Sequence, residues 1–261
     1  MRTKSTLSCI AFSLLALAVV TFFSPYVRSQ QVIASEDRER GIQLYQKGDT
    51  KGAIEALRAA TSKNRDDGGA WHYLGLALLV TGNKDEAQKA FERAATIRLN
   101  DLITISPLPL LKNPAPGSEG VKPRDRYQVA FESVEQYLAV TQNPTEDWLV
   151  TLEALRFYRD YYAGARSDET IVTTKETNTR LRILSKPPPA FSRTTASGNS
   201  VLRAVFSADG SVKHVLVLKR VAPDFDLACI EAACKIKFTP AIKDGHPVSM
   251  ILQLEYNRYF L

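Results

Sequence analysis

The sequence lacks the residue patterns of the common catalytic and metal centres. Its only histidines, His72, His214 and His246, are far apart and do not have the spacing of zinc ligands. Gly-x-Ser-x-Gly, His-Glu-x-x-His and phosphate-binding glycine motifs are also absent. Asp224 and Asp226 stand at a predicted helix start, where acidic residues are common for structural reasons. We therefore predict that the chain is not an enzyme and binds no metal or cofactor.

The chain also has few cysteines and a small net charge. The first argues against a disulfide-rich protein, and the second argues against a nucleic-acid-binding protein. Beyond residue 34 only Cys229 and Cys234 are present, which is too few for a disulfide framework. On one helix they would lie about 140° apart, so we expect two small buried side chains and no bridge. The net charge of +6 falls to 6 − 3 = +3 without the three basic residues of the first 29, which argues against nucleic-acid binding.

The first 29 residues predict an export signal or a membrane anchor. Arg2 and Lys4 form a positive start, and residues 7–23 are a mostly apolar run of 17 residues. Small and apolar residues before Gln30 fit cleavage by signal peptidase, which would release the rest of the chain. The alternative is a retained helix over residues 7–23 that holds the protein in the inner membrane, where a span needs about 20 apolar residues.

An internal repeat fills residues 40–100. Six residues of the first copy recur at a constant offset of 34: Gly41, Leu44, Gly48, Ala53, Leu57 and Ala60 match Gly75, Leu78, Gly82, Ala87, Phe91 and Ala94. Small residues allow two helices to approach closely, and the middle glycine of each copy turns the chain between them. The period and the pattern resemble the tetratricopeptide repeat, which implies a surface for an unidentified peptide or protein.

Two repeats rarely bury enough apolar surface alone, so we expect a third, degenerate helix pair. We place its helices at about residues 125–141 and 145–163. Tyr158, Tyr161 and Tyr162 on the second of these helices predict core and capping packing, with a ligand surface as the alternative. The predicted helical domain thus covers residues 36–165 and includes a proline-rich loop at residues 106–123.

A polar linker is predicted at residues 166–189, followed by a small domain at residues 190–261. β-Branched and apolar runs flank Asp209-Gly210, which is a strong hairpin signal. The register stays open, because Phe206 pairs with Lys213 across a two-residue loop and with Val212 across a longer turn.

A helix at about residues 225–237 and a last strand at residues 249–256 complete the domain. The helix has two apolar stripes: Phe225, Cys229, Ala232 and Ile236 form one, and Leu227, Ile230 and Cys234 form the other. One stripe must cover the sheet, and the other either docks elsewhere or belongs to a broadly apolar helix.

The segments "SADGSV", "PDFDLACIEAACKIKFTPA" and "KDGHPVSMILQLEYN" resemble the C-terminal domain of the TonB family of energy transducers. The resemblance lies in four pieces: Asp209-Gly210, Asp226 to Cys229 with Ala232, Phe238 to Ala241, and Gly245 to Val248. The expected fold class is α+β, with tetratricopeptide-like helical hairpins followed by a three-stranded antiparallel sheet with one helix.

The resemblance implies that the last strand receives a short peptide of an outer-membrane transporter by strand addition. The implied partner-binding residues are Ser249, Met250, Ile251, Leu252, Gln253, Leu254, Glu255 and Tyr256, with Phe191 from the segment before the first strand. It also implies a periplasmic location and, if the protein is anchored, an inner-membrane proton-driven motor as partner. One alternative is an edge blocked by residues 257–260 or by a second copy. Another is a periplasmic tetratricopeptide adaptor without an energy-coupling role.

Overall fold

The structure is a computed structural model of the whole chain, and it describes residues 35–105, 122–166, 170–190 and 197–258. The predicted leader, nearly all of the proline-rich loop and Phe191 lie outside these ranges. No helix in the described ranges is both long enough and apolar enough to cross a membrane.

The chain divides into two compact units, Met1–Ala90 and Phe91–Leu261. The division falls inside helix α4 (Lys84–Asp101) and not in the predicted linker at residues 166–189. A compact unit and a domain need not share a boundary, so the domain boundaries predicted from the sequence stay a prediction.

The first unit consists of helical hairpins. Residues 35–46 are helical, and α2 (Thr50–Lys63), α3 (Gly68–Val80) and the first part of α4 follow. A methyl group on Gly41 would lie 2.5 Å from Leu57 Cγ, so only glycine allows this approach of two helices. Gly48 and Gly82 have φ angles of 84° and 80°, as left-handed turns after helices require. The predicted helix–turn–helix repeats are therefore confirmed.

The second unit begins with the end of α4 and the short helix η1 (Leu102–Thr104). The predicted helix pair is present as α5 (Pro123–Val140) and α6 (Glu146–Tyr162). Tyr158 is fully buried and stacks on Tyr127 with ring centroids 5.6 Å apart, and Tyr162 stacks on the same ring at 4.8 Å. These tyrosines therefore form core packing, and Tyr158 cannot be part of a ligand surface.

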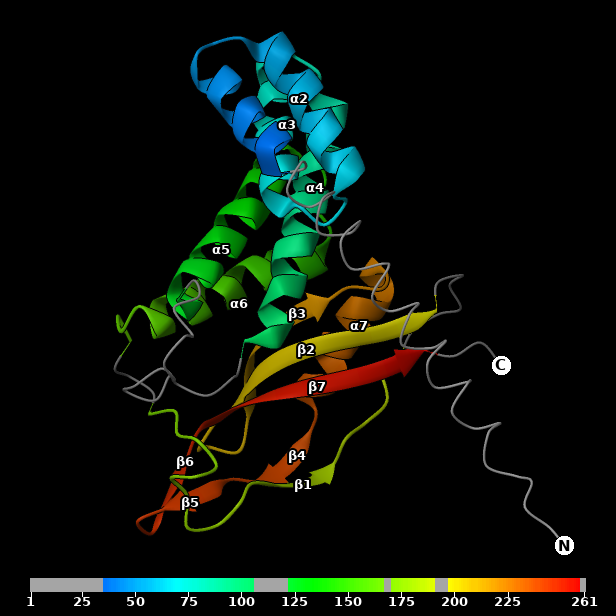
Figure 1. The fold of residues 1–261 in the computed structure, drawn as a ribbon. Helices are drawn as coiled ribbons and strands as arrows, with labels where there is room; N and C mark the ends of the chain where they lie inside the picture. Colours follow the sequence, from blue (N-terminus) through cyan, green and yellow to red (C-terminus); the bar gives the residue numbers. More distant parts are fainter. Residues whose placement is uncertain (1–34, 106–121, 167–169, 191–196, 259–261) are drawn as a thin grey trace, which may run out of the picture. The chain divides into compact units, whose positions relative to one another are not determined.

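The rest of this unit is the predicted sheet with its helix, as Figure 1 shows. Its elements are β1 (Arg182–Ser185), β2 (Gly198–Phe206), β3 (Val212–Lys219), α7 (Pro223–Cys234), β4 (Lys237–Thr239), β5 (Ala241–Lys243), β6 (His246–Val248) and β7 (Met250–Arg258). The main sheet has the antiparallel order β3-β2-β7, while β1 pairs with β4 and β5 pairs with β6 in two small ribbons. The three-stranded sheet was predicted, but the two ribbons were not.

The β2–β3 hairpin uses the longer of the two turns that the sequence allows. Phe206 pairs with Val212, not with Lys213. Gly210 donates its N–H to the Ser207 carbonyl at 3.0 Å and has a φ of 84°, so a glycine closes the turn and adds one residue.

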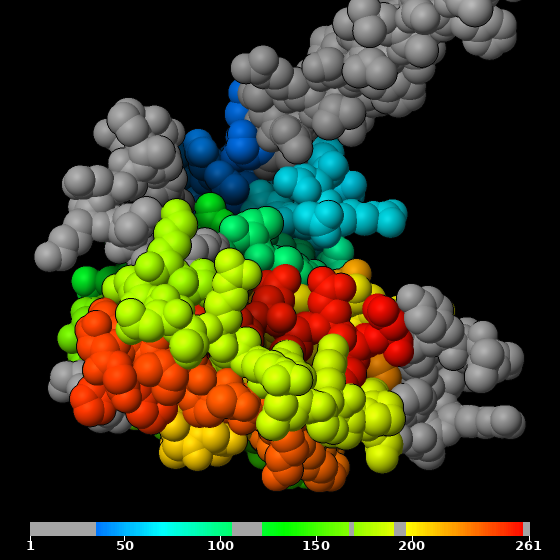
Figure 2. Space-filling view, turned by 90° about the horizontal axis from the view of Figure 1, so that it is seen from below, coloured from blue at the N-terminus to red at the C-terminus, as the bar shows by residue number. Residues whose placement is uncertain are grey.

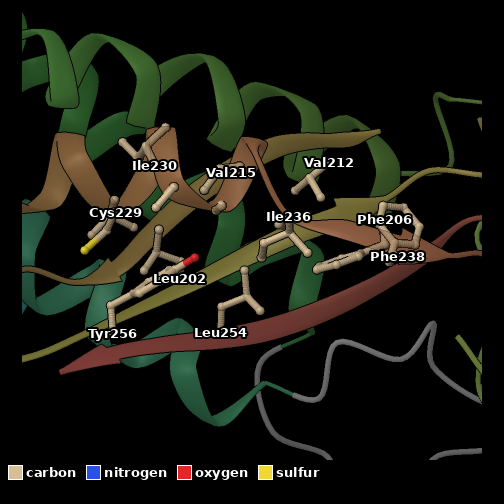
Figure 3. Close-up of a cluster of buried hydrophobic side chains, with 14 of the residues drawn as sticks. Leu202, Phe206, Val212, Val215, Cys229, Ile230, Ile236, Phe238, Leu254 and Tyr256 are labelled. Atoms are coloured by element: carbon tan, nitrogen blue, oxygen red, sulfur yellow. The ribbon is translucent and has the colours of Figure 1, made fainter. Parts of the chain in front are cut away.

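Both faces of the main sheet are buried, and this explains why β2 does not alternate between buried and exposed residues. One face packs on α7, where Leu202, Leu254 and Tyr256 point toward Cys229 and Ile230 (Figure 3). The helices cover the other face, with α6 packed on β3. A strand that is covered on both sides is apolar along its whole length.

Helix α7 buries the first of the two predicted apolar stripes, but it does not bury both cysteines. Phe225, Cys229, Ala232 and Ile236 are all buried against the sheet. Ile230 of the second stripe is also buried and belongs to the same core. Both cysteines are free thiols, but Cys234 is exposed, so the expectation of two buried cysteines is wrong for Cys234. The helix ends there because the chain turns into β4.

A buried arginine ties the sheet to the helices. Arg203 in β2 is fully buried, and its guanidinium donates to Tyr127 Oη at 2.5 Å. It also donates to the carbonyl oxygens of Leu102 at 3.1 Å and Ile105 at 2.7 Å, at the end of η1. These acceptors carry no formal charge, so the guanidinium is held by hydrogen bonds alone.

We predict that Arg203→Met lowers the free energy of unfolding by about 3 kcal/mol or more, because it leaves buried acceptors without donors. Denaturant unfolding measures the loss, and Arg182→Met on exposed β1 is the matched control. Tyr127→Phe should cost less in the Arg203→Met background than in the wild type, because one hydrogen bond is then already lost. Equal unfolding midpoints for the Arg203 and Arg182 variants would refute this role of Arg203.

Candidate functional site

Strand β7 is the open edge of the main sheet. It pairs with β2 without any slip, from Phe206↔Met250 to Gly198↔Arg258. No strand of the described chain adds to its other side, whereas α6 packs on β3 at the opposite end of the sheet. Figure 1 shows β7 in red at the border of the sheet. An edge of this kind presents main-chain N–H and C=O groups to a further strand.

Two hydrogen bonds identify which residues of β7 point outward. The Ser249 carbonyl accepts from Val172 N–H at 3.0 Å, and the Glu255 carbonyl accepts from Lys186 Nζ at 2.7 Å. Main-chain groups of an antiparallel strand alternate between its two sides, so Ile251 and Gln253 point the same way. Within the described ranges, no main-chain bond reaches these two residues from outside the sheet.

The side chains of the predicted site differ widely in exposure. Only Gln253 and Glu255 are exposed, and Leu252 is half-buried. The remaining five are buried: Ser249, Met250, Ile251, Leu254 and Tyr256. The structure thus brings the predicted strand together as an edge, but most of its residues can offer a partner only their main-chain groups.

Both ends of this edge are covered by segments that the sequence assigned to a linker. At one end, Ile171 forms a parallel bridge with Ser249, and Val172 is buried beside Met250. At the other end, Lys186 follows β1 and reaches Glu255. Figure 2 shows β7 (red) at the surface, bordered by the yellow-green residues 170–190. The β-branched run at residues 171–174 was the sequence signal for this contact.

The contact of Lys186 is strengthened by an aromatic ring. Its ammonium lies 4.4 Å from the centre of the Tyr256 ring. Burial raises the pKa of Tyr256 to about 12, so the ring stays neutral at physiological pH and the contact is a cation–π interaction. Asn199 Nδ2 donates to Glu255 Oε2 at 3.1 Å, which fixes the exposed carboxylate beside the same strand.

This edge presents main-chain groups of the kind that pair with an extended peptide. Main-chain hydrogen bonds would give affinity, and alternate side chains would give selectivity. The described residues contain no group of three or more histidine, cysteine or acidic side chains that could hold a metal ion. Asp226 at the start of α7 accepts from Val221 N–H at 3.1 Å and from Ser200 Oγ at 3.1 Å, which is a structural role.

Two stretches of the chain match known families. Residues 188–257 match the Gram-negative bacterial TonB protein C-terminal family, and residues 44–102 match a tetratricopeptide repeat family. The chain carries a TonB C-terminal domain after tetratricopeptide repeats. None of the curated proteins matches the chain. The TonB match contains β7 as far as Asn257 but begins after Lys186, so both covering segments lie upstream of it.

These matches support a coarse description of the role. The TonB C-terminal match indicates a TonB-like role for residues 188–257, and the repeat match indicates interactions with other proteins. Neither family is enzymatic.

We predict that amide hydrogen exchange alternates along β7. The outward amides of Ile251 and Gln253 should exchange at least about tenfold faster than the inward amides of Leu252 and Leu254, a difference of roughly 1.4 kcal/mol in opening free energy. Residue-resolved NMR measures the rates. Equal protection at all four positions would mean that the outer side of β7 is already paired.

Proposed function

We propose that this protein binds a short segment of an outer-membrane transporter as an additional strand on β7. If its N-terminal segment is retained as an anchor, it couples that transporter to an inner-membrane proton-driven motor. The observation that carries the proposal is the pair of outward residues, Ile251 and Gln253, on a strand whose other side is fully paired. The TonB match over residues 188–257 supports the transporter as the partner class.

The edge is suited to strand addition because the strand itself is held firmly. Nine consecutive pairs join β7 to β2, and the side chains of Leu254 and Tyr256 are buried in the core with α7. The strand is already ordered before a peptide binds. Only the peptide therefore loses conformational entropy on binding. Ile251 and Gln253 together present two N–H and two C=O groups, and each satisfied hydrogen bond contributes about 0.5–1.5 kcal/mol.

A second function is a periplasmic adaptor that uses the same edge without transmitting energy. The tetratricopeptide match at residues 44–102 favours it, because such repeats supply a second protein-binding surface. The two functions differ at the N-terminus, since a chain released by signal peptidase has no connection to a motor.

The first prediction of the proposal concerns Gln253→Pro. The N–H of Gln253 points outward, so proline removes a donor from the edge and leaves the β2–β7 ladder intact. We expect transporter-peptide affinity to fall about tenfold or more while the circular dichroism spectrum and unfolding midpoint stay near those of Gln253→Ala. Leu252→Pro is the contrasting variant, because its inward N–H belongs to the ladder and its loss should unfold the sheet.

The binding partner for this measurement comes from a crosslink. A photoreactive residue at position 253 in cells should capture a segment of an outer-membrane transporter, which mass spectrometry identifies. Capture of a second copy of this chain, or unchanged affinity of the Gln253→Pro variant for the captured segment, would contradict strand addition at this edge.

The second prediction separates energy coupling from the adaptor function. Energy coupling requires that the mature protein retains residues 7–23, so peptides from this segment should be found in the mature protein. A mature species that begins at Gln30 would remove the motor from the proposal and leave the adaptor. Mass spectrometry of the protein purified from its native membrane or periplasm makes the distinction.

A further inference from the structure

The open part of the β7 edge is short because the chain itself occupies both ends. The Ser249 carbonyl is taken by Val172 N–H at 3.0 Å, and the Glu255 carbonyl is taken by Lys186 Nζ at 2.7 Å. Five residues of β7 lie between these two positions, from Met250 to Leu254. Among them, only Ile251 and Gln253 point outward, so the accessible edge is a window of two outward residues.

Both covering groups are fixed by contacts of their own. Val172 is 4% exposed and packs with Ala241 and Met250 in a small separate core. Lys186 directly follows β1, which pairs with β4 through Ile183↔Phe238 and Ser185↔Lys237. These anchors hold the two groups in place when no partner is bound.

The sequence around Lys186 restricts it further. Pro187 follows immediately, and the residue before a proline is confined to extended conformations. Three consecutive prolines have no N–H groups, so residues 187–189 cannot supply main-chain donors to the edge. The lysine ammonium therefore closes the end of the edge, and its position over the Tyr256 ring at 4.4 Å gives it a defined place.

We propose that Lys186 and the Ile171–Val172 segment are end stops that set the length and register of the strand that β7 accepts. This inference rests on the proposed function of the same edge. Side chains along a strand repeat every two residues, so a bare edge would accept a partner shifted by two residues almost equally well. A stop at each end removes that freedom, because a shifted or longer strand would have to displace a bonded group.

The window also defines the chemistry of its occupant. Leu252 is half-buried on the side of the sheet that faces α7, whereas Gln253 is exposed on the other side. A matching segment is extended over about five residues, with an apolar side chain beside Leu252 and a polar one beside Gln253. Residues before and after these five should turn away from the sheet.

Lys186→Met tests the stop at Glu255, because methionine keeps an apolar chain over the Tyr256 ring but loses the ammonium. Nested synthetic peptides of five, seven and nine residues, trimmed from either end of the segment that crosslinks to position 253, serve as probes. With the wild type, affinity should level off near five residues. With Lys186→Met, extension at one terminus only should raise affinity roughly three- to tenfold, because the Glu255 carbonyl becomes available.

Two matched variants separate this effect from a general one. Lys237→Met removes an exposed lysine from β4 and should keep the wild-type dependence on length. Lys186→Arg keeps a donor at the same place, so it should show the wild-type dependence of affinity on peptide length. Lys186 would not be a stop if affinity depended on peptide length in the same way in the wild type and in Lys186→Met. An equal change in affinity for every peptide would also contradict this role. Loss of all binding in the wild type would instead mean that the proposed function itself is wrong.

Discussion

The hydrogen bonds of one buried guanidinium join the sheet of the second unit to its helices. Arg203 sits in the central strand of the sheet and reaches Tyr127 of α5 and the carbonyls at the end of η1. A second, largely buried cation also reaches a helix: Arg220 forms an ion pair with Asp147 of α6 and lies 3.8 Å from the Trp148 ring centre. Burial of these charges is tolerated because each one finds hydrogen-bond or ion-pair partners across the boundary between sheet and helices.

This constraint decides which part of the sheet can bind another protein. With α7 on one face and helices on the other, neither face is available, and α6 packs on β3. Only the outer side of β7 is left accessible in the described sheet. Val172 and Lys186 occupy its two ends, so the accessible part is the middle of the strand. If β7 accepts a further strand as proposed, main-chain groups at Ile251 and Gln253 carry most of the recognition. Such recognition tolerates many side chains, so specificity must come from length, register and the few exposed groups nearby.

Local chemistry explains what the sequence could predict. Glycines at positions 48 and 82 marked the helix turns, and Asp209-Gly210 marked the hairpin, because each requirement is satisfied within a few residues. The hairpin register was not decidable, since both turns suit the same dipeptide. The ribbons β1–β4 and β5–β6 were missed because strands of three or four residues show no period. In the sequence, Arg203 looks like a polar residue on the exposed face of a strand. It is buried because segments about a hundred residues upstream cover it.

The candidate site illustrates the same limit at longer range. The resemblance to the TonB domain pointed to the last strand as the edge, but Lys186 and Glu255 are 69 residues apart, and no local pattern joins them. The TonB match begins at residue 188, so a fragment cut at that boundary would lose Lys186, β1 and the helices that bury Arg203. Its sheet would expose Val201, Val205 and Leu216, which are buried in the whole unit, and its edge would lack both covering segments. Binding by such a fragment would therefore report a wider and less selective edge than the one that the complete chain presents.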